Sequence, residues 1–204
     1  MTDKSGTKRV VLATRNLHKA REIRRILDSL PLTVLDLKDF PQIPKIAETG
    51  SSFRENALIK ARTVFDHTGL WALGDDSGLE VAALNGAPGI FSARFAGPQG
   101  DYRANNTRLL NELKGFPPEK RSARFCCTVA IVGPRTEKTV EGVVPGRILS
   151  EPRGQSGFGY DPLFVPEGYQ KTFAELGDEL KNQISHRAIA FRKAAEVLQL
   201  ILRD

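Results

Sequence analysis

The chain has 204 residues, with 30 Lys and Arg against 24 Asp and Glu, which gives a formal net charge of +6. This length suits one domain, or two small lobes sharing a cleft, with a core that needs no disulfide. No apolar run approaches the about 18 residues of a membrane span and no secretory apolar region is visible, so we expect neither membrane association nor export.

The N-terminal part of the chain predicts a strand, a helix and a second strand. Residues 9–13 form an apolar run typical of a buried strand, and Asn16 is a candidate N-cap for the helix. Pro31 ends this helix, whose apolar residues at helical spacing are Ile23, Ile26, Leu27 and Leu30. Residues 32–36 predict the second strand.

The next segment predicts another helix and two short strands. Ser52 and Glu55 have the spacing of a capping box, and the helix after them carries an apolar stripe of Phe53, Ala57, Ala61, Val64 and Phe65. Residues 71–74 and 79–84 predict two short strands that flank an acidic turn with the sequence DDSG.

The remainder predicts two helices and two longer strands. A Gly/Pro-rich loop over 85–100 precedes a helix over 102–113, and strands are expected over 123–132 and 138–149 with a turn between them. The last helix should begin near Ser185, with a core-facing stripe of Ala188, Phe191, Ala195, Leu198 and Leu202. Strands that alternate with helices predict a layered α/β fold.

The only two cysteines, Cys126 and Cys127, are neighbours within an apolar run. In a strand their side chains would point to opposite faces, which disfavours a bridge between them. We therefore expect reduced thiols and a cytoplasmic location.

The first polar motif, TRNLHK, lies where a strand ends and a helix begins. The hydroxyl of Thr14, the amide of Asn16, the cation of Lys19 and free N–H groups of the helix would suit a phosphate chain. The alternative is an ordinary turn in which Asn16 caps the helix and Lys19 is solvated.

The second motif is the acidic sequence GDDSGLE, which we consider together with ETG at 48–50. Mg²⁺ typically takes one or two carboxylates plus substrate phosphates, so two separated acids from these segments could hold it jointly with a substrate if they converge on one cleft. The alternative is that Asp75, Asp76 and Ser77 only form a turn. For Glu55 we favour helix capping over metal ligation.

The third and fourth motifs lie towards the C-terminus. In GFGYDP, Phe158 and Tyr160 could offer a face to a purine ring and Asp161 could accept hydrogen bonds from a base, although a structural turn is the alternative. In KNQISHR, His186 and Arg187 fall in the first turn of a helix, where cations are unfavourable unless an anionic ligand is present. Simple exposure of both residues is the alternative.

Together these motifs resemble the inosine triphosphate pyrophosphatase family, also called XTP/dITP pyrophosphatases. The resemblance runs through LATRNLHK (12–19), ETGSSFRENALIKA (48–61), GDDSGLEVAALNGAPGIFSARFAG (74–97), GFGYDPLF (157–164) and KNQISHR (181–187). It implies an elongated, two-lobed α/β fold with a central mixed sheet flanked by helices, an active cleft between the lobes, and a homodimer. We expect one pyrophosphatase domain over 1–204, with residues 1–8 disordered.

The resemblance also implies roles for individual residues. Thr14, Asn16 and Lys19 would hold the triphosphate, and Glu48 and Asp76 would hold Mg²⁺, with Asp76 also acting as the general base. Ser77 would contact the substrate, and the base would be framed by Phe158, Gly159, Tyr160, Asp161, Lys181, His186 and Arg187. Whether Asp75 and Glu55 complete the ligand set stays open. The family usually has a small or amide residue where this chain has Arg15, which could contact phosphate or face solvent.

The implied reaction is hydrolysis of dITP, ITP or XTP to the monophosphate and pyrophosphate, with a water oriented by Asp76 attacking the α-phosphorus. The C6 oxygen of hypoxanthine or xanthine could accept from Arg187 or His186, whereas the amino group of adenine could not.

Two alternatives remain: a pyrophosphatase for modified pyrimidine nucleotides, and a basic nucleic-acid-binding module suggested by the +6 charge. The basic residues are scattered among acids, so a stable nucleic-acid partner is not expected.

Overall fold

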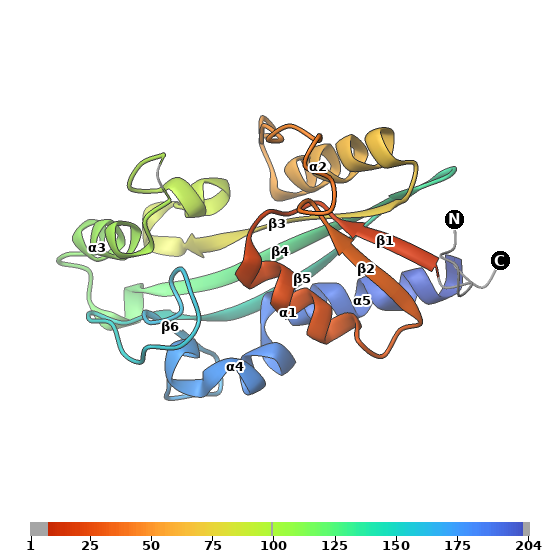
Figure 1. Ribbon diagram of the computed structural model, residues 1–204. Helices are drawn as coiled ribbons and strands as arrows, with labels where there is room; N and C mark the ends of the chain where they lie inside the picture. Colours follow the sequence, from red (N-terminus) through yellow and green to blue (C-terminus); the bar gives the residue numbers. More distant parts are fainter. Residues whose placement is uncertain (1–7, 99, 202–204) are drawn as a thin grey trace. The chain divides into compact units, whose positions relative to one another are not determined.

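The chain forms an α/β fold, as expected, in a computed structural model that describes residues 8–98 and 100–201 (Figure 1). Its strands are β1 (Lys8–Leu12), β2 (Leu32–Asp36), β3 (Trp71–Val81), β4 (Ser122–Gly133), β5 (Thr136–Ile148) and β6 (Phe164–Pro166). Its α-helices are α1 (Leu17–Leu27), α2 (Phe53–Thr68), α3 (Tyr102–Glu112), α4 (Phe173–Ile184) and α5 (His186–Ile201). None of the described helices is long and apolar enough to cross a membrane.

The strands form one mixed sheet in the order β2-β1-β3-β4-β5-β6. Strand β1 is parallel to both of its neighbours, with Val10 opposite Val34 of β2 and Val11 opposite Ala72 of β3. Strand β6 is antiparallel to β5. The predicted mixed sheet is therefore confirmed.

The chain divides into two compact units. Among the described residues, the first unit contains 8–76, 127–142 and 187–201, and the second contains 77–126 and 143–186. The long strands β3, β4 and β5 contribute residues to both units. Of residues 1–8, for which we expect disorder, Lys8 begins β1 and the others lie outside the described residues.

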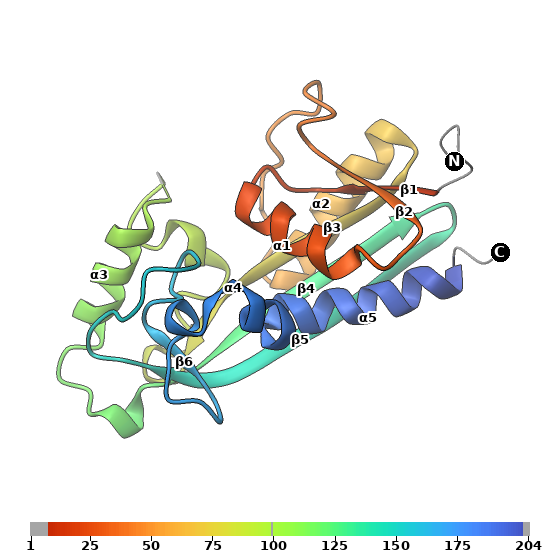
Figure 2. The same ribbon diagram turned by 60° about the horizontal axis from the view of Figure 1, so that its bottom comes forward.

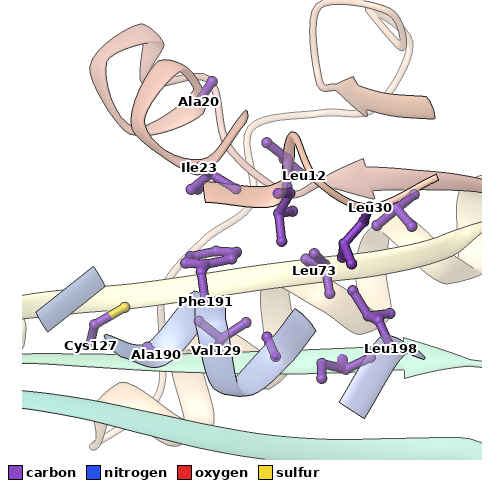
Figure 3. Close-up of a cluster of buried hydrophobic side chains, with 14 residues drawn as sticks. Leu12, Ala20, Ile23, Leu30, Leu73, Cys127, Val129, Ala190, Phe191 and Leu198 are labelled. Carbon is purple, nitrogen blue, oxygen red and sulfur yellow. The ribbon is translucent and has the colours of Figure 1, made fainter. Parts of the chain in front are cut away.

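The first unit buries apolar side chains on both faces of its strands. In β1, Val10 and Leu12 join a cluster with α1 and α5, whereas Val11 joins a second cluster with α2. This division follows from the alternation of side chains along a strand. Figures 1 and 2 show α2 and α5 on opposite faces, and in Figure 3 the ring of Phe191 from α5 points towards Ile23 of α1.

The helix signals of the first unit are largely confirmed. Asn16 caps α1, because its side-chain oxygen accepts from the N–H groups of His18 and Lys19 at 3.0 and 3.2 Å. Ser52 caps α2, but the carboxylate of Glu55 accepts from Ser51 instead of closing the expected box with Ser52. Glu55 therefore accepts from Ser51, the residue before the N-cap, and not from the N-cap Ser52 itself.

The second unit is built around a cluster of aromatic rings. Phe125 of β4 lies 4.7 Å from Phe164 of β6 between ring centroids, and Phe164 lies 5.3 Å from Phe173 of α4. The ring of His186 stacks on Phe125 at 4.6 Å. Burial of these rings fixes α4 against the sheet.

One expectation for the secondary structure needs correction, and two elements were not predicted. The segments around DDSG form the continuous strand β3, not two strands with a turn. Helix α4 and strand β6 were not predicted, although Thr172 and Glu175 form a complete capping box at the start of α4. The last helix begins at His186 as expected, and its buried stripe includes Phe191 and Leu198, whereas Leu202 lies outside the described residues.

Candidate functional site

The polar motifs of the first unit meet at the carboxyl end of β1. Helix α1 follows β1 and helix α2 precedes β3, and the two helices pack on opposite faces of the sheet. In sheets of this kind, ligands bind beyond the carboxyl ends of the strands where the connections change face. The N–H of Ala13 donates to Leu73 of β3 at 2.8 Å. This contact places Thr14 and the start of α1, which carries Lys19, close to the part of β3 that continues to Asp75.

Asp75 and Asp76 are consecutive residues of β3, so their side chains point to opposite faces of the sheet. Both are buried, with exposed fractions of 3% and 5%. Each carboxylate contacts its own cations, Asp75 on the α1 side and Asp76 on the α2 side. Because different cations neutralise the two carboxylates on opposite faces of the sheet, two adjacent acids fit within a strand and do not form the expected turn.

Asp75 holds two cations from different helices. Its Oδ2 lies 2.8 Å from Nζ of Lys19 and 3.8 Å from Nε of Arg187. Arg187 also contacts Glu22 of α1 at 2.5 Å. Burial opposes ionisation of Asp75, but Lys19 and Arg187 outweigh it, so the pKa of this carboxyl lies well below its usual value.

On the opposite face, Lys60 of α2 joins the two acids that the sequence assigns to a metal. Its Nζ lies 2.8 Å from Oε1 of Glu48 and 3.0 Å from Oδ1 of Asp76. Burial lowers the pKa of Lys60, but Asp76, Asp75 and Glu48 outweigh this effect and raise it overall. Burial raises the pKa of Asp76, and the nearby lysines only partly offset this.

Asn56 fixes the second oxygen of Asp76. The Nδ2 of Asn56 donates to Oδ2 of Asp76 at 3.2 Å, and its Oδ1 accepts from the N–H of Gly50 at 2.8 Å. Gly74 allows α2 to approach this closely, because a Cβ there would lie 2.2 Å from the carbonyl oxygen of Ala57. Asn56 thus connects the ETG segment to the acid on β3.

The donor set fits a Mg²⁺ ion that is held jointly with a substrate. Glu48 and Asp76 contact one ammonium group, so their oxygens already converge on a single cationic position. No cluster of three or more His, Cys, Asp or Glu side chains suited to a metal occurs among the described residues. Two carboxylates are the number that Mg²⁺ typically takes when phosphates and waters supply the rest.

The other residues of the first motif are also placed. The Oγ1 of Thr14 accepts from the N–H of Asn16 at 3.1 Å, and Asn16 itself serves as the N-cap. Arg15 donates to the carbonyl oxygen of Ile43 at 2.5 Å. Arg15 therefore connects this turn to the segment that precedes Glu48. This role differs from the two considered from the sequence, a phosphate contact and exposure to solvent.

In the second unit, residues 157–162 form a tight loop, here called the base loop, around Asp161. Oδ2 of Asp161 accepts from the N–H of Phe158 at 2.8 Å and from Nζ of Lys181 at 2.6 Å. The same Nζ lies 4.4 Å from the centroid of the Phe158 ring. Gly157 is required because a Cβ would lie 2.2 Å from the Asp161 carboxylate.

The two aromatic residues of the base loop differ in position. Tyr160 is buried, and its hydroxyl donates to the carbonyl oxygen of Ser92 at 2.9 Å, so its ring belongs to the core of the second unit. The ring of Phe158 is half-buried, so part of its surface is exposed, unlike that of Tyr160. Ser77 follows Asp76 directly in β3 and is half-buried.

His186 and Arg187 are buried, with exposed fractions of 4% and 2%, which excludes the alternative that both are simply exposed. They belong to different units: His186 stacks on Phe125 in the second, and Arg187 joins Asp75 in the first. Lys181 lies in the second unit with the base loop, while Lys19 and Asp76 lie in the first.

Three residues whose side chains contact the site were not predicted, namely Glu22, Asn56 and Lys60. Asn56 and Lys60 are spaced four residues apart on α2, beside the apolar stripe, and this spacing is the signal that could have revealed them. Glu22 sits among other charges on α1 and carries no such signal.

Residues 10–197 match the model of the Ham1 family, which covers most of the chain. The chain belongs to the Ham1 family. The resemblance inferred from the five motifs is thereby confirmed.

Relatives within the Ham1 family match almost the whole chain. A Geobacter sulfurreducens protein named dITP/XTP pyrophosphatase is 51% identical over 183 residues, 89% of this chain and 92% of the relative. A protein of the same name from Frankia alni is 50% identical over 200 residues, which cover 95% of this chain and 98% of the relative.

Solved Ham1 structures share the fold. The HAM1 protein from Coxiella burnetii matches with a TM-score of 0.87 and 42% identity, covering 95% of this chain and 99% of that one. A nucleoside-triphosphatase, or dITP/XTP pyrophosphatase, from Mycobacterium abscessus gives a TM-score of 0.75 and 44% identity over the same shares of the two chains.

The stabilising effect of Asp75 should depend on pH. Because Lys19 and Arg187 lower its folded-state pKa, the unfolded chain binds the proton more tightly, and the stabilisation is present above the usual value of 3.8 and lost below it. We expect wild type to exceed Asp75→Asn by about 3 kcal/mol in unfolding free energy near neutral pH. Urea unfolding at falling pH should show this gap closing below about pH 4; a constant gap would contradict the assignment.

Proposed function

We propose that this Ham1 protein hydrolyses non-standard purine nucleoside triphosphates, such as dITP, ITP and XTP, to the monophosphate and pyrophosphate. The observation that carries the proposal is the pair of charge networks around Asp75 and Asp76. They combine convergent acids for a metal with cations for phosphates. The names of the Geobacter and Frankia relatives support the same reaction.

The charge balance of the two networks around Asp75 and Asp76 favours a divalent metal as part of substrate binding. The two networks contain three cations, Lys19, Lys60 and Arg187, against four carboxylates, Glu22, Glu48, Asp75 and Asp76. A polyphosphate chain would add further negative charge, which costs free energy unless another cation joins. Bound Mg²⁺ would supply that charge and act as a Lewis acid on the phosphates.

Glu48 and Asp76 would hold this ion, and Thr14, Asn16 and Lys19 would orient the triphosphate. Asp76 would also orient a water for attack on the α-phosphorus. The new bond joins the water oxygen to phosphorus, the bond from phosphorus to the bridging oxygen breaks, and the water proton passes to the Asp76 carboxylate. Each carboxylate oxygen has two lone pairs, so Asp76 can accept this proton while Lys60 and Asn56 hold it.

The family resemblance assigns the base contacts to individual residues. The ring of Phe158 would stack on the purine, with Ser77, Gly159, Tyr160, Asp161 and Lys181 around it. The C6 oxygen would accept from His186 or Arg187. Adenine has an amino donor at C6, so the buried donor would stay unpaired.

The base preference can be measured with a panel of triphosphates. An unmade buried hydrogen bond costs about 1 to 3 kcal/mol, so we expect kcat/KM for dITP, ITP and XTP to exceed that for ATP by about 5- to 150-fold. The assay follows pyrophosphate release with Mg²⁺ and with EDTA. Equal rates for ATP and ITP, release of orthophosphate, or preference for a modified pyrimidine nucleotide would contradict the proposal.

The cellular setting is proposed on separate grounds. Neither Cys126 nor Cys127 forms a disulfide in the described part of the chain, which suits a cytoplasmic location. We expect a homodimer from the family resemblance. Light scattering of the purified protein tests the dimer.

A further inference from the structure

Helix α3 contacts two consecutive residues of the base loop through one of its faces. Tyr102 and Asn106 are four residues apart and therefore neighbours on the helix surface. The ring centroids of Tyr102 and Phe158 are 5.9 Å apart, with the planes tilted by 40°. The Nδ2 of Asn106 donates to the carbonyl oxygen of Gly159 at 3.0 Å.

The helix that carries these side chains is itself firmly anchored within the second unit. Asp101 caps its N-terminus. Asn105, 2% exposed, accepts from the N–H of Ala96 at 2.6 Å and donates to the carbonyl oxygen of Ala93 at 3.2 Å. Leu109 is fully buried. A contact from α3 can therefore hold the base loop in place instead of moving with it.

The two polar atoms of the Asn106 side chain differ: Nδ2 donates to Gly159, whereas Oδ1 makes no hydrogen bond among the described residues. Its Oδ1 is buried and has no hydrogen-bond partner within the described part of the chain. Such an acceptor costs free energy, and native structures contain few of them.

The ring of Phe158 is held by two helices. Lys181 of α4 places its ammonium over the ring, and Tyr102 of α3 provides the ring contact. Gly159, which Asn106 holds, has a φ of 65° and lies in the left-handed region. A stacking surface fixed before the ligand arrives binds more tightly, because less conformational freedom is lost on binding.

We infer that Tyr102 and Asn106 are positioning residues for purine recognition: they fix the Phe158 ring and the Gly159 carbonyl in the geometry that receives the base. This inference rests on the proposed function, which assigns Phe158 to the base. Neither residue needs to touch the nucleotide, so both act through the base loop.

The experiment compares Tyr102→Ala, Tyr102→Phe and Asn106→Leu, with Arg103→Ala as a control at an exposed position of α3. Tyr102→Ala and Asn106→Leu are expected to raise KM for dITP by about three- to tenfold with little change in kcat. The inhibition constant of inorganic tripolyphosphate, which has no base, should stay at the wild-type value. Tyr102→Phe keeps the ring and should restore the KM.

A second measurement does not depend on the substrate. Hydrogen exchange of the amides in 157–162 should become faster in Tyr102→Ala and Asn106→Leu, while exchange in α3 stays as in wild type. If wild type releases no pyrophosphate from dITP, the proposed function fails, and unchanged loop exchange would overturn the positioning as well. If wild type is active, an unchanged KM, or an equal rise for dITP and tripolyphosphate, overturns the inference alone.

Discussion

Replacing Asp76 with Asn is expected to abolish turnover, with kcat falling by about 10³-fold or more. The change removes both a metal ligand and the group that would accept the proton. It keeps the size of the side chain, so the loss would not come from a cavity. Pyrophosphate release from dITP under saturating Mg²⁺ measures the effect.

The matched control is Asp66→Asn, which changes an exposed acid on α2. The Asp76 variant also brings an amide NH₂ towards Lys60 or Nδ2 of Asn56, both of which are donors. Its melting temperature must therefore be compared with that of wild type before the kinetics are interpreted. A folded Asp76→Asn protein with near-normal turnover would refute the role assigned to this carboxylate.

Much of the first unit could be predicted because its signals are local. The helix start at Asn16 depends on one short side chain that reaches nearby N–H groups, and β2 is a short apolar run before a charged turn. The strand through Asp75 and Asp76 could not be predicted this way. Adjacent acids indicate a turn unless each finds its own cation, and Lys19 and Lys60 arrive from distant helices.

In the base loop, too, local sequence could not show which side chains find distant partners. The motif identified Phe158 and Tyr160 as equivalent aromatic candidates, because local sequence does not say which ring points into the core. The hydrogen bond from Tyr160 to Ser92, 68 residues earlier, decides this in the folded chain. Helix α4 escaped prediction for a different reason: Gly177 has a φ of 78° within it and interrupts the helical pattern.

The networks around Asp75 and Asp76 also show why the motifs identified the site but not its buried cation Lys60. Glu48, Lys19 and Asp76 lie in motifs whose wording resembles a known family. Lys60 lies in the same stretch as Glu48, yet a lysine beside an apolar stripe is usually read as solvated. Burial of its ammonium between two carboxylates marks it as part of the site in the folded chain.

Replacing Lys60 with Met is expected to lower the unfolding free energy of the metal-free protein by about 3 kcal/mol. The side chain of Lys60 is 8% exposed, and its removal leaves Asp76 without its nearest cation in a buried position. Glu48, whose side chain is 29% exposed, can regain some water. We therefore expect a loss of unfolding free energy at the lower end of the range that is usual when one partner of a buried ion pair is removed. Urea unfolding in EDTA, with Lys38→Met as an exposed control, measures it.

Two further measurements separate the charge effect from packing. Adding Glu48→Gln to Lys60→Met removes one of the stranded charges, so the double variant should recover part of the lost stability, as a double-mutant cycle reports. Mg²⁺ should stabilise Lys60→Met more than wild type, because the two carboxylates no longer share an ammonium. Equal responses of Lys60→Met and Lys38→Met would mean that Lys60 does not hold Glu48 and Asp76 together.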